Sequence, residues 1–226
     1  MYLDPKMIGK KRSTKLQKLI EQGKWNEVNA LVKTDPDQLL VAGSSLETLP
    51  VHDAVRKAAP LKMVKRMVQA APDALRQTDK IGRIPLHHVL TAEPRALTMI
   101  GGLVDYLLSC DSSTSKVRDV DGNLPLHLAC GYGAEIGVVK SLIEAHPDGV
   151  LEQNGKGNIP SQLGLGSLQQ LVAMRWIREN YPATRKVVKK RNRERLRSRP
   201  FEEKTLGGKI LRFLPPLGDG GAVCLL

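Results

Sequence analysis

A short unit built around a proline recurs along this chain, and the recurrence restricts the possible folds more than any other feature. The repeated tetrapeptides are Leu49-Pro50-Val51-His52, Ile84-Pro85-Leu86-His87, Leu124-Pro125-Leu126-His127 and Ile159-Pro160-Ser161-Gln162, which begin at intervals of 35, 40 and 35 residues. A fixed period of this length is typical of repeat proteins, in which each unit packs against its two neighbours.

The unit at 121–146 shows what each copy is expected to form. Asp121-Gly122 favours a turn, and Pro125 suits the first residue of a helix, where a missing N–H costs nothing. Gly133 lies where this helix should end. A second helix is expected from Glu135 to His146, because apolar residues recur there at spacings of three and four. The sequence therefore predicts a turn and two helices in each unit.

The best-preserved copy, Gly122-Asn123-Leu124-Pro125-Leu126-His127-Leu128-Ala129, resembles the ankyrin repeat. The resemblance extends over roughly residues 13–182, and the other copies match it in part. It implies an all-α fold, namely an ankyrin-type helix-turn-helix solenoid with short turn fingers and basic terminal tails. We expect an N-terminal capping helix pair followed by four degenerate repeats.

The copies depart from the family pattern at specific positions. Glu47 stands where the turn glycine belongs, and Gln162 replaces the histidine of the last copy. The family's threonine before the proline is absent from every copy, and its place is taken by Leu49, Ile84, Leu124 and Ile159. We therefore expect packing of these apolar residues to hold the turns.

The formal net charge of +12 is concentrated at the two ends of the chain. Residues 1–12 carry four Lys and Arg against one Asp, residues 13–182 carry nineteen against eighteen acidic residues, and residues 183–226 carry twelve against four. The chain is thus expected to comprise a basic N-terminal tail (1–12), a nearly neutral ankyrin-repeat domain (13–182) and a basic, Gly/Pro-containing C-terminal tail (183–226). The segment from Phe201 to Leu226 is expected to be loop or disordered, because it is rich in Gly and Pro.

Apolar and sulfur-containing residues give further expectations. The second helix of the last repeat is expected to be carried by Leu168, Leu171, Val172, Met174 and Trp176. Cys110 and Cys130 are expected to be packing residues, and the lack of paired cysteine spacing suggests a reducing compartment. No signal peptide or transmembrane segment is recognisable, so we expect a cytoplasmic or nuclear protein.

The sequence indicates no catalytic site, cofactor or metal. His52, His87 and His127 occupy the same repeat position, where the resemblance implies hydrogen bonds between the turns of consecutive repeats. Stacked units would hold such residues about 8–10 Å apart, too far for one metal ion to bind them together. The acidic residues show no convergent pair for general acid–base chemistry. We therefore expect a non-catalytic protein.

The resemblance implies that a protein partner binds the turn tips and the inner face of the first helices. The tip positions are Thr48, Arg83, Asn123 and Asn158, and the inner positions include Arg56, Lys57 and Tyr132. Tyr and Arg are enriched among the residues that dominate binding energy, so Tyr132 and Arg83 are the preferred anchors. The predicted function is protein–protein interaction as an adaptor or scaffold, by a chain that is monomeric on its own.

A second interpretation concerns the basic residues of the C-terminal tail, which are Arg185, Lys186, Lys189, Lys190, Arg191, Arg193, Arg195, Arg197 and Arg199. They could neutralise the phosphates of a nucleic acid, act as a nuclear-import signal or lie on an anionic membrane. They could also form a solvated helical extension of the stack. The alternative function is therefore a nucleic-acid-associated protein that binds through residues 185–199, with the repeats as assembly scaffold.

Overall fold

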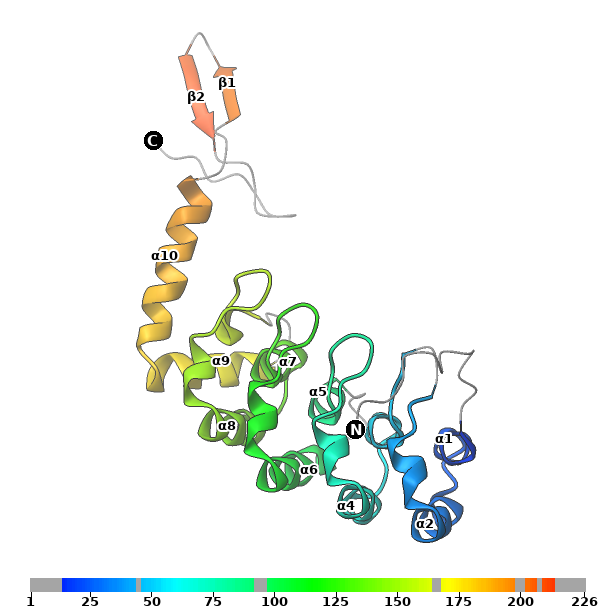
Figure 1. Ribbon diagram of the computed structural model, residues 1–226. Helices are drawn as coiled ribbons and strands as arrows, with labels where there is room; N and C mark the ends of the chain where they lie inside the picture. The colour runs from blue at the N-terminus through cyan, green and yellow to red at the C-terminus, as the bar shows by residue number, and fades with distance from the viewer. Residues whose placement is uncertain are drawn as a thin grey trace.

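Helix pairs stacked side by side make up most of the structure (Figure 1). The computed structural model describes residues 14–43, 46–91, 97–163, 168–197, 202–206 and 209–213. Its four complete pairs are α1 (Lys15–Glu21) with α2 (Trp25–Thr34), α3 (Pro50–Arg56) with α4 (Leu61–Ala70), α5 (Pro85–Leu90) with α6 (Leu97–Cys110), and α7 (Pro125–Tyr132) with α8 (Ile136–Ala145). The fold is therefore mostly helical, in agreement with the expected class.

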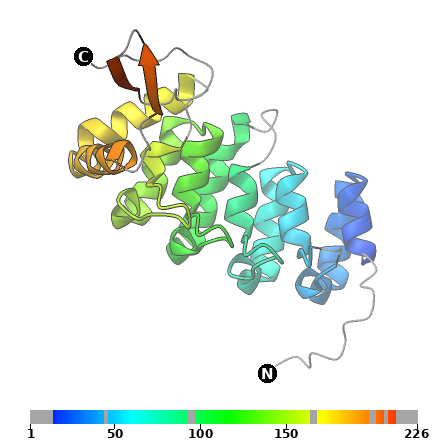
Figure 2. The ribbon, with the colours of Figure 1, turned by 90° about the horizontal axis from the view of Figure 1, so that it is seen from above.

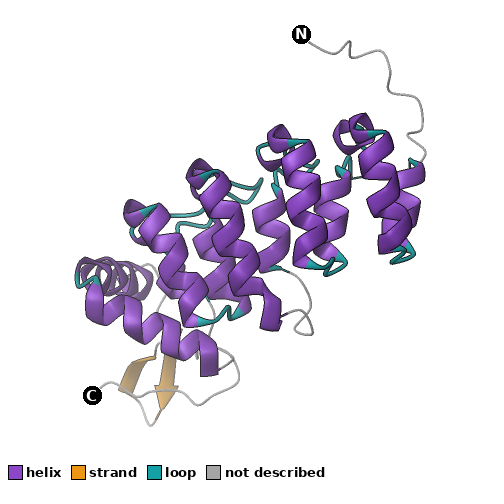
Figure 3. Cartoon of the chain, turned by 90° about the horizontal axis from the view of Figure 1, so that it is seen from below, coloured by secondary structure: helices purple, strands orange, loops and turns teal. Residues whose placement is uncertain are grey.

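The pairs build two rows of helices. The first helices, α1, α3, α5 and α7, contact one another in that order, and so do the second helices, α2, α4, α6 and α8 (Figures 2 and 3). A 3₁₀ turn follows most second helices, at Pro36–Leu40, Pro72–Leu75, Ser112–Lys116 and Pro147–Val150. The chain then crosses to the next pair through an extended turn, which we call a finger.

Local sequence explains how the short helices begin and end. Pro50, Pro85 and Pro125 are the first residues of α3, α5 and α7. Gly133 ends α7 with a φ of 78°, in the left-handed region that glycine adopts without steric cost. Ala58 occupies the corresponding place after α3 with a φ of 52°, so an L-residue there accepts a strained conformation.

The core lies between the two rows of helices. The second helices turn one apolar face inward, as α4 does with Met63, Val64, Met67 and Val68. The four apolar residues before the repeat prolines, Leu49, Ile84, Leu124 and Ile159, are all buried. This burial confirms the expectation that these apolar residues are packed at the turns.

The N-terminal end of the stack has a polar outer surface. Lys15, Lys18, Glu21 and Lys24 are exposed, while Leu16 and Ile20 of α1 are fully buried. Thr14 caps α1 by accepting a hydrogen bond from the Gln17 backbone N–H at 3.2 Å. Such a surface suits a terminal unit, which has a neighbour on one side only.

The C-terminal end differs from the expectation. A 3₁₀ turn, Pro160–Gln162, replaces the first helix, and α9 (Leu168–Asn180) takes the place of the second. Leu168, Leu171 and Val172 of α9 are exposed rather than packed, because they lie on the side opposite Ala173, Met174 and Ile177. The sequence pattern could not reveal that no further helix covers this side in the described part of the chain.

The C-terminal tail contains regular structure. Helix α10 (Ala183–Arg197) projects away from the stack (Figure 1), and it contacts α9. Strands β1 (Glu202–Leu206) and β2 (Lys209–Phe213) pair antiparallel, with Glu202 opposite Phe213 and Leu206 opposite Lys209. We expected loop here, but the sequence places Gly-Gly between the two strands, a dipeptide that favours tight hairpin turns. The basic tail residue Arg199 and the N-terminal tail 1–12 lie outside the described residues.

Of the two cysteines that the structure describes, one is buried and the other is exposed. Cys130 is fully buried in α7, as expected, and burial raises the pKa of its thiol to about 12. Cys110, at the end of α6, is exposed, so the expectation that it is a packing residue like Cys130 was wrong. The last turn of α6 carries it beyond the apolar face formed by Val104, Leu107 and Leu108. In the described part of the chain, none of the helices is long and apolar enough to cross a membrane.

Candidate functional site: the turn fingers and the groove beside Tyr132

The fingers at 79–83, 119–123 and 154–158 are each shaped by one side chain at the base. The residues are Asp79, Asp119 and Asn154, spaced like the repeat prolines. The Oδ1 atom accepts hydrogen bonds from the backbone N–H groups two and four residues later, at 3.0 and 2.9 Å for Asp79, 3.0 and 2.8 Å for Asp119, and 3.1 and 2.9 Å for Asn154. A single side-chain oxygen, Oδ1 of an Asp or Asn, therefore fixes the backbone of a whole finger.

A left-handed residue lets each finger turn back. The positions are Glu47, Gly82, Gly122 and Gly157, with φ values of 55°, 71°, 73° and 68°. Consecutive fingers are also joined by backbone hydrogen bonds, from Lys80 N to Leu46 O at 2.9 Å, Val120 N to Ile81 O at 3.0 Å and Gly155 N to Asp121 O at 2.8 Å. The fingers consequently form one connected row along the edge of the stack.

The repeat histidines fasten the helix starts to the fingers. Their Nδ1 atoms accept the backbone N–H of the residue before the proline, from Leu49 at 3.1 Å, Ile84 at 3.2 Å and Leu124 at 3.2 Å. His52 Nε2 lies 3.1 Å from the carbonyls of Gln77 and Arg83, and His127 Nε2 lies 2.9 Å from that of Asn158. The Nε2 contacts of His52 and His127 confirm the predicted structural role, because they reach from one unit to the next.

These rings are neutral and structural at neutral pH. Burial lowers the pKa of His52 and of His87 to about 4, and it lowers the pKa of His88 and His127 as well. With Nδ1 occupied as an acceptor, the ring proton must lie on Nε2. His87 is buried as well, and its ring faces the backbone of Asn123 in the next finger, a contact that opposes part of the pKa shift.

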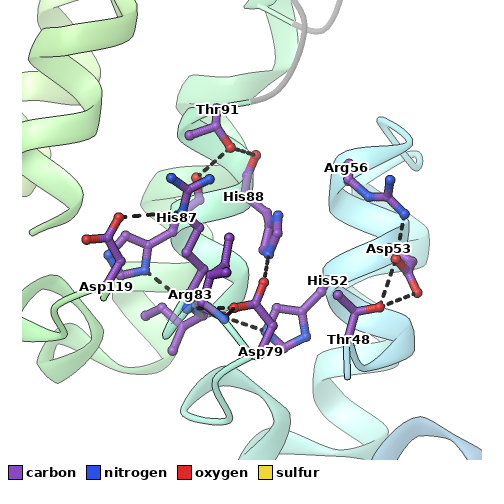
Figure 4. Close-up of polar contacts among 12 residues, drawn as sticks. Thr48, His52, Asp53, Arg56, Asp79, Arg83, His87, His88, Thr91 and Asp119 are labelled. Carbon is purple, nitrogen blue, oxygen red and sulfur yellow. Dashed lines mark hydrogen bonds and ion pairs between the residues drawn. The ribbon is translucent and has the colours of Figure 1, made fainter. Parts of the chain in front are cut away.

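A second polar cluster lies where α3, α5 and the finger at 79–83 meet (Figure 4). Its members are Asp79, His88 and His52: His88 Nε2 lies 2.9 Å from Asp79 Oδ2, and the rings of His88 and His52 meet edge to face at 5.3 Å. All three residues are buried. Because Asp79 also holds its finger, this cluster locks α5 to the turn. Within the described residues, no three His, Cys, Asp or Glu side chains are placed to hold a metal ion.

The row of fingers and the end of α7 enclose a groove of about 340 Å³. Its lining includes Arg83, Asn123, Tyr132, Asn154, Lys156 and Leu163. The structure thus brings together three predicted partner-binding residues, Arg83, Asn123 and Tyr132. Tyr132, the last residue of α7, is 61% exposed, which is unusual for a large aromatic side chain with no partner covering it.

The polar residues of the groove are held by one another. Asn154 Nδ2 donates to Asn123 Oδ1 at 2.8 Å, and Asn123 Nδ2 donates to Asp119 Oδ2 at 3.3 Å. Arg83 Nε lies 3.5 Å from the same Asp119 oxygen, as Figure 4 shows for this pair. The two terminal nitrogens of Arg83 make no hydrogen bond with any described residue, so they remain available as donors.

The other predicted partner residues lie elsewhere. Arg56 and Lys57 are exposed at the end of α3, where Arg56 Nη2 is 2.8 Å from Asp53 Oδ1. Asn158 is half-buried, and its backbone carbonyl is used by His127. Thr48, expected at a tip, is buried, and its hydroxyl lies 3.1 Å from Asp53 Oδ2. Its preceding residue, Glu47, occupies the bend instead, so the chain turns Thr48 inward.

Sequence reasoning missed the side chains that shape the groove from below. Asp119 and Asn154 recur with Asp79 at the same intervals as the prolines, and this signal was present in the sequence. The contribution of Lys156 and Leu163 had no such signal, because it depends on how neighbouring units stack.

Comparisons of the sequence with known protein families and curated proteins found no relative. No protein-family model matches the sequence, and a comparison with curated proteins gives no match. The function must therefore be inferred from the geometry of the chain itself.

Proposed function

We propose that this chain is an ankyrin-type solenoid that acts without catalysis, as a scaffold that binds a protein partner in the groove beside Tyr132. The observation that carries the proposal is the convergence of Arg83, Asn123 and Tyr132 on one groove, with Tyr132 61% exposed. Tyrosine and arginine supply large contact area and directed hydrogen bonds, and they are enriched where binding energy concentrates.

The connected fingers support this role. Backbone N–H groups donate hydrogen bonds to Asp119 and Asn154, and these bonds hold the walls of the groove in place before any partner arrives. Such preorganisation reduces the loss of conformational entropy that accompanies binding. The available Arg83 N–H groups would donate hydrogen bonds to an oxygen of the partner, and the ring of Tyr132 would pack beside it.

The test compares matched variants of the full chain. Tyr132→Ala and Arg83→Ala alter the groove, whereas Leu151→Ala changes a side chain that is 41% exposed and does not line it. Proteins captured from lysate by each variant are quantified, and a photoreactive residue is placed at position 132 or 151. Loss of a central tyrosine costs about 2 kcal/mol, roughly thirtyfold in affinity.

The expected result is a set of proteins that crosslinks at position 132 and is depleted by Tyr132→Ala and Arg83→Ala but not by Leu151→Ala. Helical circular dichroism checks that every variant is folded. Equal recovery of all proteins on all variants would reject the groove as the binding site.

Nucleic-acid association remains a second candidate because of α10. Residues 183–197 carry eight Lys and Arg against Glu194, and this helix projects from the stack (Figure 1). A projecting basic helix can neutralise several phosphates, which would make binding strongly salt-dependent.

A further inference from the structure

The outer side of α9 is an apolar face at the end of the stack. Leu168, Leu171 and Val172 are 74%, 53% and 47% exposed, and they lie within little more than one helical turn. The opposite end of the stack is closed by the charged side chains of α1. A terminal unit normally presents a polar surface, so an apolar one indicates that another element covers it.

A pocket adjoins this face in the corner between α9 and α10. It has a volume of about 390 Å³, and it is lined by Leu171, Met174, Arg175, Arg178, Glu179 and Arg185. Met174 is buried and forms part of an apolar floor together with Leu171. The volume suits one or two apolar side chains.

Positive charge surrounds the pocket. Between Leu168 and Lys190 the basic residues are Arg175, Arg178, Arg185, Lys186, Lys189 and Lys190, and the acidic residue is Glu179. Glu179 is paired with Arg175 at 2.8 Å. Arg178 donates to the Ser161 carbonyl at 3.2 Å, while its Nε is buried without a hydrogen-bond partner among the described residues. The net charge of this segment is therefore +5.

These features select one kind of occupant. A second copy of the same face would bring like charges together, which costs binding energy. Phosphates of a nucleic acid would leave the apolar floor unused. A flat bilayer fits a recessed corner between two helices poorly. An amphipathic helix with acidic and apolar side chains matches both the floor and the charged walls.

We propose that the corner between α9 and α10 binds an acidic amphipathic helix of a partner protein. An apolar side chain of that helix enters the pocket over Leu171 and Met174, and its carboxylates face Arg178 and Arg185. This surface is separate from the groove beside Tyr132, so the two sites can be tested independently.

The test uses the full chain and a defined probe. The probe is a fluorescein-labelled helical peptide of about five turns, with leucines on one face and glutamates on the other. A matched peptide carries glutamine in place of every glutamate. Binding is measured by fluorescence anisotropy for the native chain, Leu171→Asp and Arg185→Glu. The controls are Leu151→Asp and Lys62→Glu, two exposed positions away from the corner.

We expect Leu171→Asp and Arg185→Glu each to weaken binding of the acidic peptide by about tenfold, and the controls to leave it unchanged. The glutamine peptide should bind at least about tenfold more weakly than the acidic one. Tyr132→Ala should have no effect, which separates this site from the groove.

Equal binding by all variants, or equal binding of the two peptides, would overturn the proposal. Two further probes, duplex DNA and phosphatidylserine vesicles, are titrated in parallel. If either binds in a Leu171-dependent manner while the acidic peptide does not bind, that partner class replaces the one proposed.

Discussion

Individual backbone positions show how each repeat differs in strain. Ala58 and Gly133 occupy the same place after α3 and α7, and both have positive φ, at 52° and 78°. A side chain at such a position meets the neighbouring carbonyl oxygen, which costs about 1 kcal/mol. The pair α3–α4 therefore carries a backbone strain at Ala58 that is absent at Gly133 in the pair α7–α8.

Exchanging these two residues should move stability in opposite directions. Ala58→Gly should raise the free energy of unfolding by about 1 kcal/mol, and Gly133→Ala should lower it by about the same amount. Ala58 is exposed, so the first change removes little packing. Urea unfolding followed by circular dichroism measures both. A destabilised Ala58→Gly variant would contradict the strain assigned to this position.

Because burial lowers the pKa of the buried histidines, we expect the folded chain to lose stability in acid. The pKa of His87 is about 4 in the folded chain, because burial disfavours the charged ring, and an unfolded histidine titrates near 6.5. The unfolded state then binds more protons, so folding weakens as pH falls below about 6.5 and the loss is complete below about 4. His52 and His87, whose pKa values are both about 4, should each lower the free energy of unfolding by about 2 kcal/mol between pH ~7 and pH ~5.

Replacing His87 by glutamine isolates this effect. Gln162 shows that glutamine fits the position, since its Oε1 accepts the Ile159 N–H at 2.9 Å. His87→Gln should therefore be less sensitive to acid than the native chain by about 2 kcal/mol over this range. Parallel pH profiles of unfolding free energy for the two proteins would exclude His87 as a source of acid sensitivity.

At the scale of the elements, the fingers depend on close backbone contact. A Cβ at Gly155 would lie 2.6 Å from the Asp121 carbonyl oxygen, the same atom that accepts the Gly155 N–H. A Cβ at Gly137 in α8 would meet nothing within 4 Å. Gly155 is therefore needed for the close approach of two finger backbones, whereas the space around Gly137 would accommodate a larger side chain.

Alanine substitution at these glycines should separate the two cases. Gly155→Ala should lower the free energy of unfolding by about 1–3 kcal/mol, because the fingers must move apart. Gly137→Ala should raise it by up to about 1 kcal/mol through helix propensity. Thermal unfolding of the two variants gives the comparison. If Gly155→Ala is as stable as Gly137→Ala, the fingers do not need this contact.

For the whole molecule, the stack and the basic helix α10 should be energetically separate. The main contacts of α10 are with α9, whereas each inner helix packs between neighbours on both sides. Stability in such an arrangement is approximately a sum of unit and neighbour terms. Removal of residues 187–226 should therefore change the free energy of unfolding of the stack by about 1 kcal/mol or less.

The same truncation tests the nucleic-acid candidate. Binding of a duplex DNA should fall steeply with salt in the full chain and disappear in the truncated protein. A full-length control replaces Arg191, Arg193, Arg195 and Arg197 by glutamine, which keeps the length and removes the charge. Undiminished DNA binding by the truncated protein would place the phosphate contacts elsewhere.

The sequence by itself determined the repeating unit, the starts of the short helices and the positions of the histidines. These features are local: proline fixes one dihedral angle, apolar spacing follows the helical period, and each histidine bonds a backbone group three residues before it. Part of the candidate site was implied by the resemblance to the ankyrin repeat, which pointed to Arg83, Asn123 and Tyr132, and these three residues line one groove.

Only the tertiary structure decided which of these residues meet and which are covered. Thr48 turns inward and contacts Asp53, and Asn154 donates a hydrogen bond to Asn123 on the preceding finger. Leu168 of α9 is exposed, although the apolar spacing around it is that of a helix with one buried face. The physical reason is that exposure depends on whether a neighbouring unit is present, and hydrogen bonds between fingers depend on the stacking distance. Neither quantity is contained in the sequence of a single repeat.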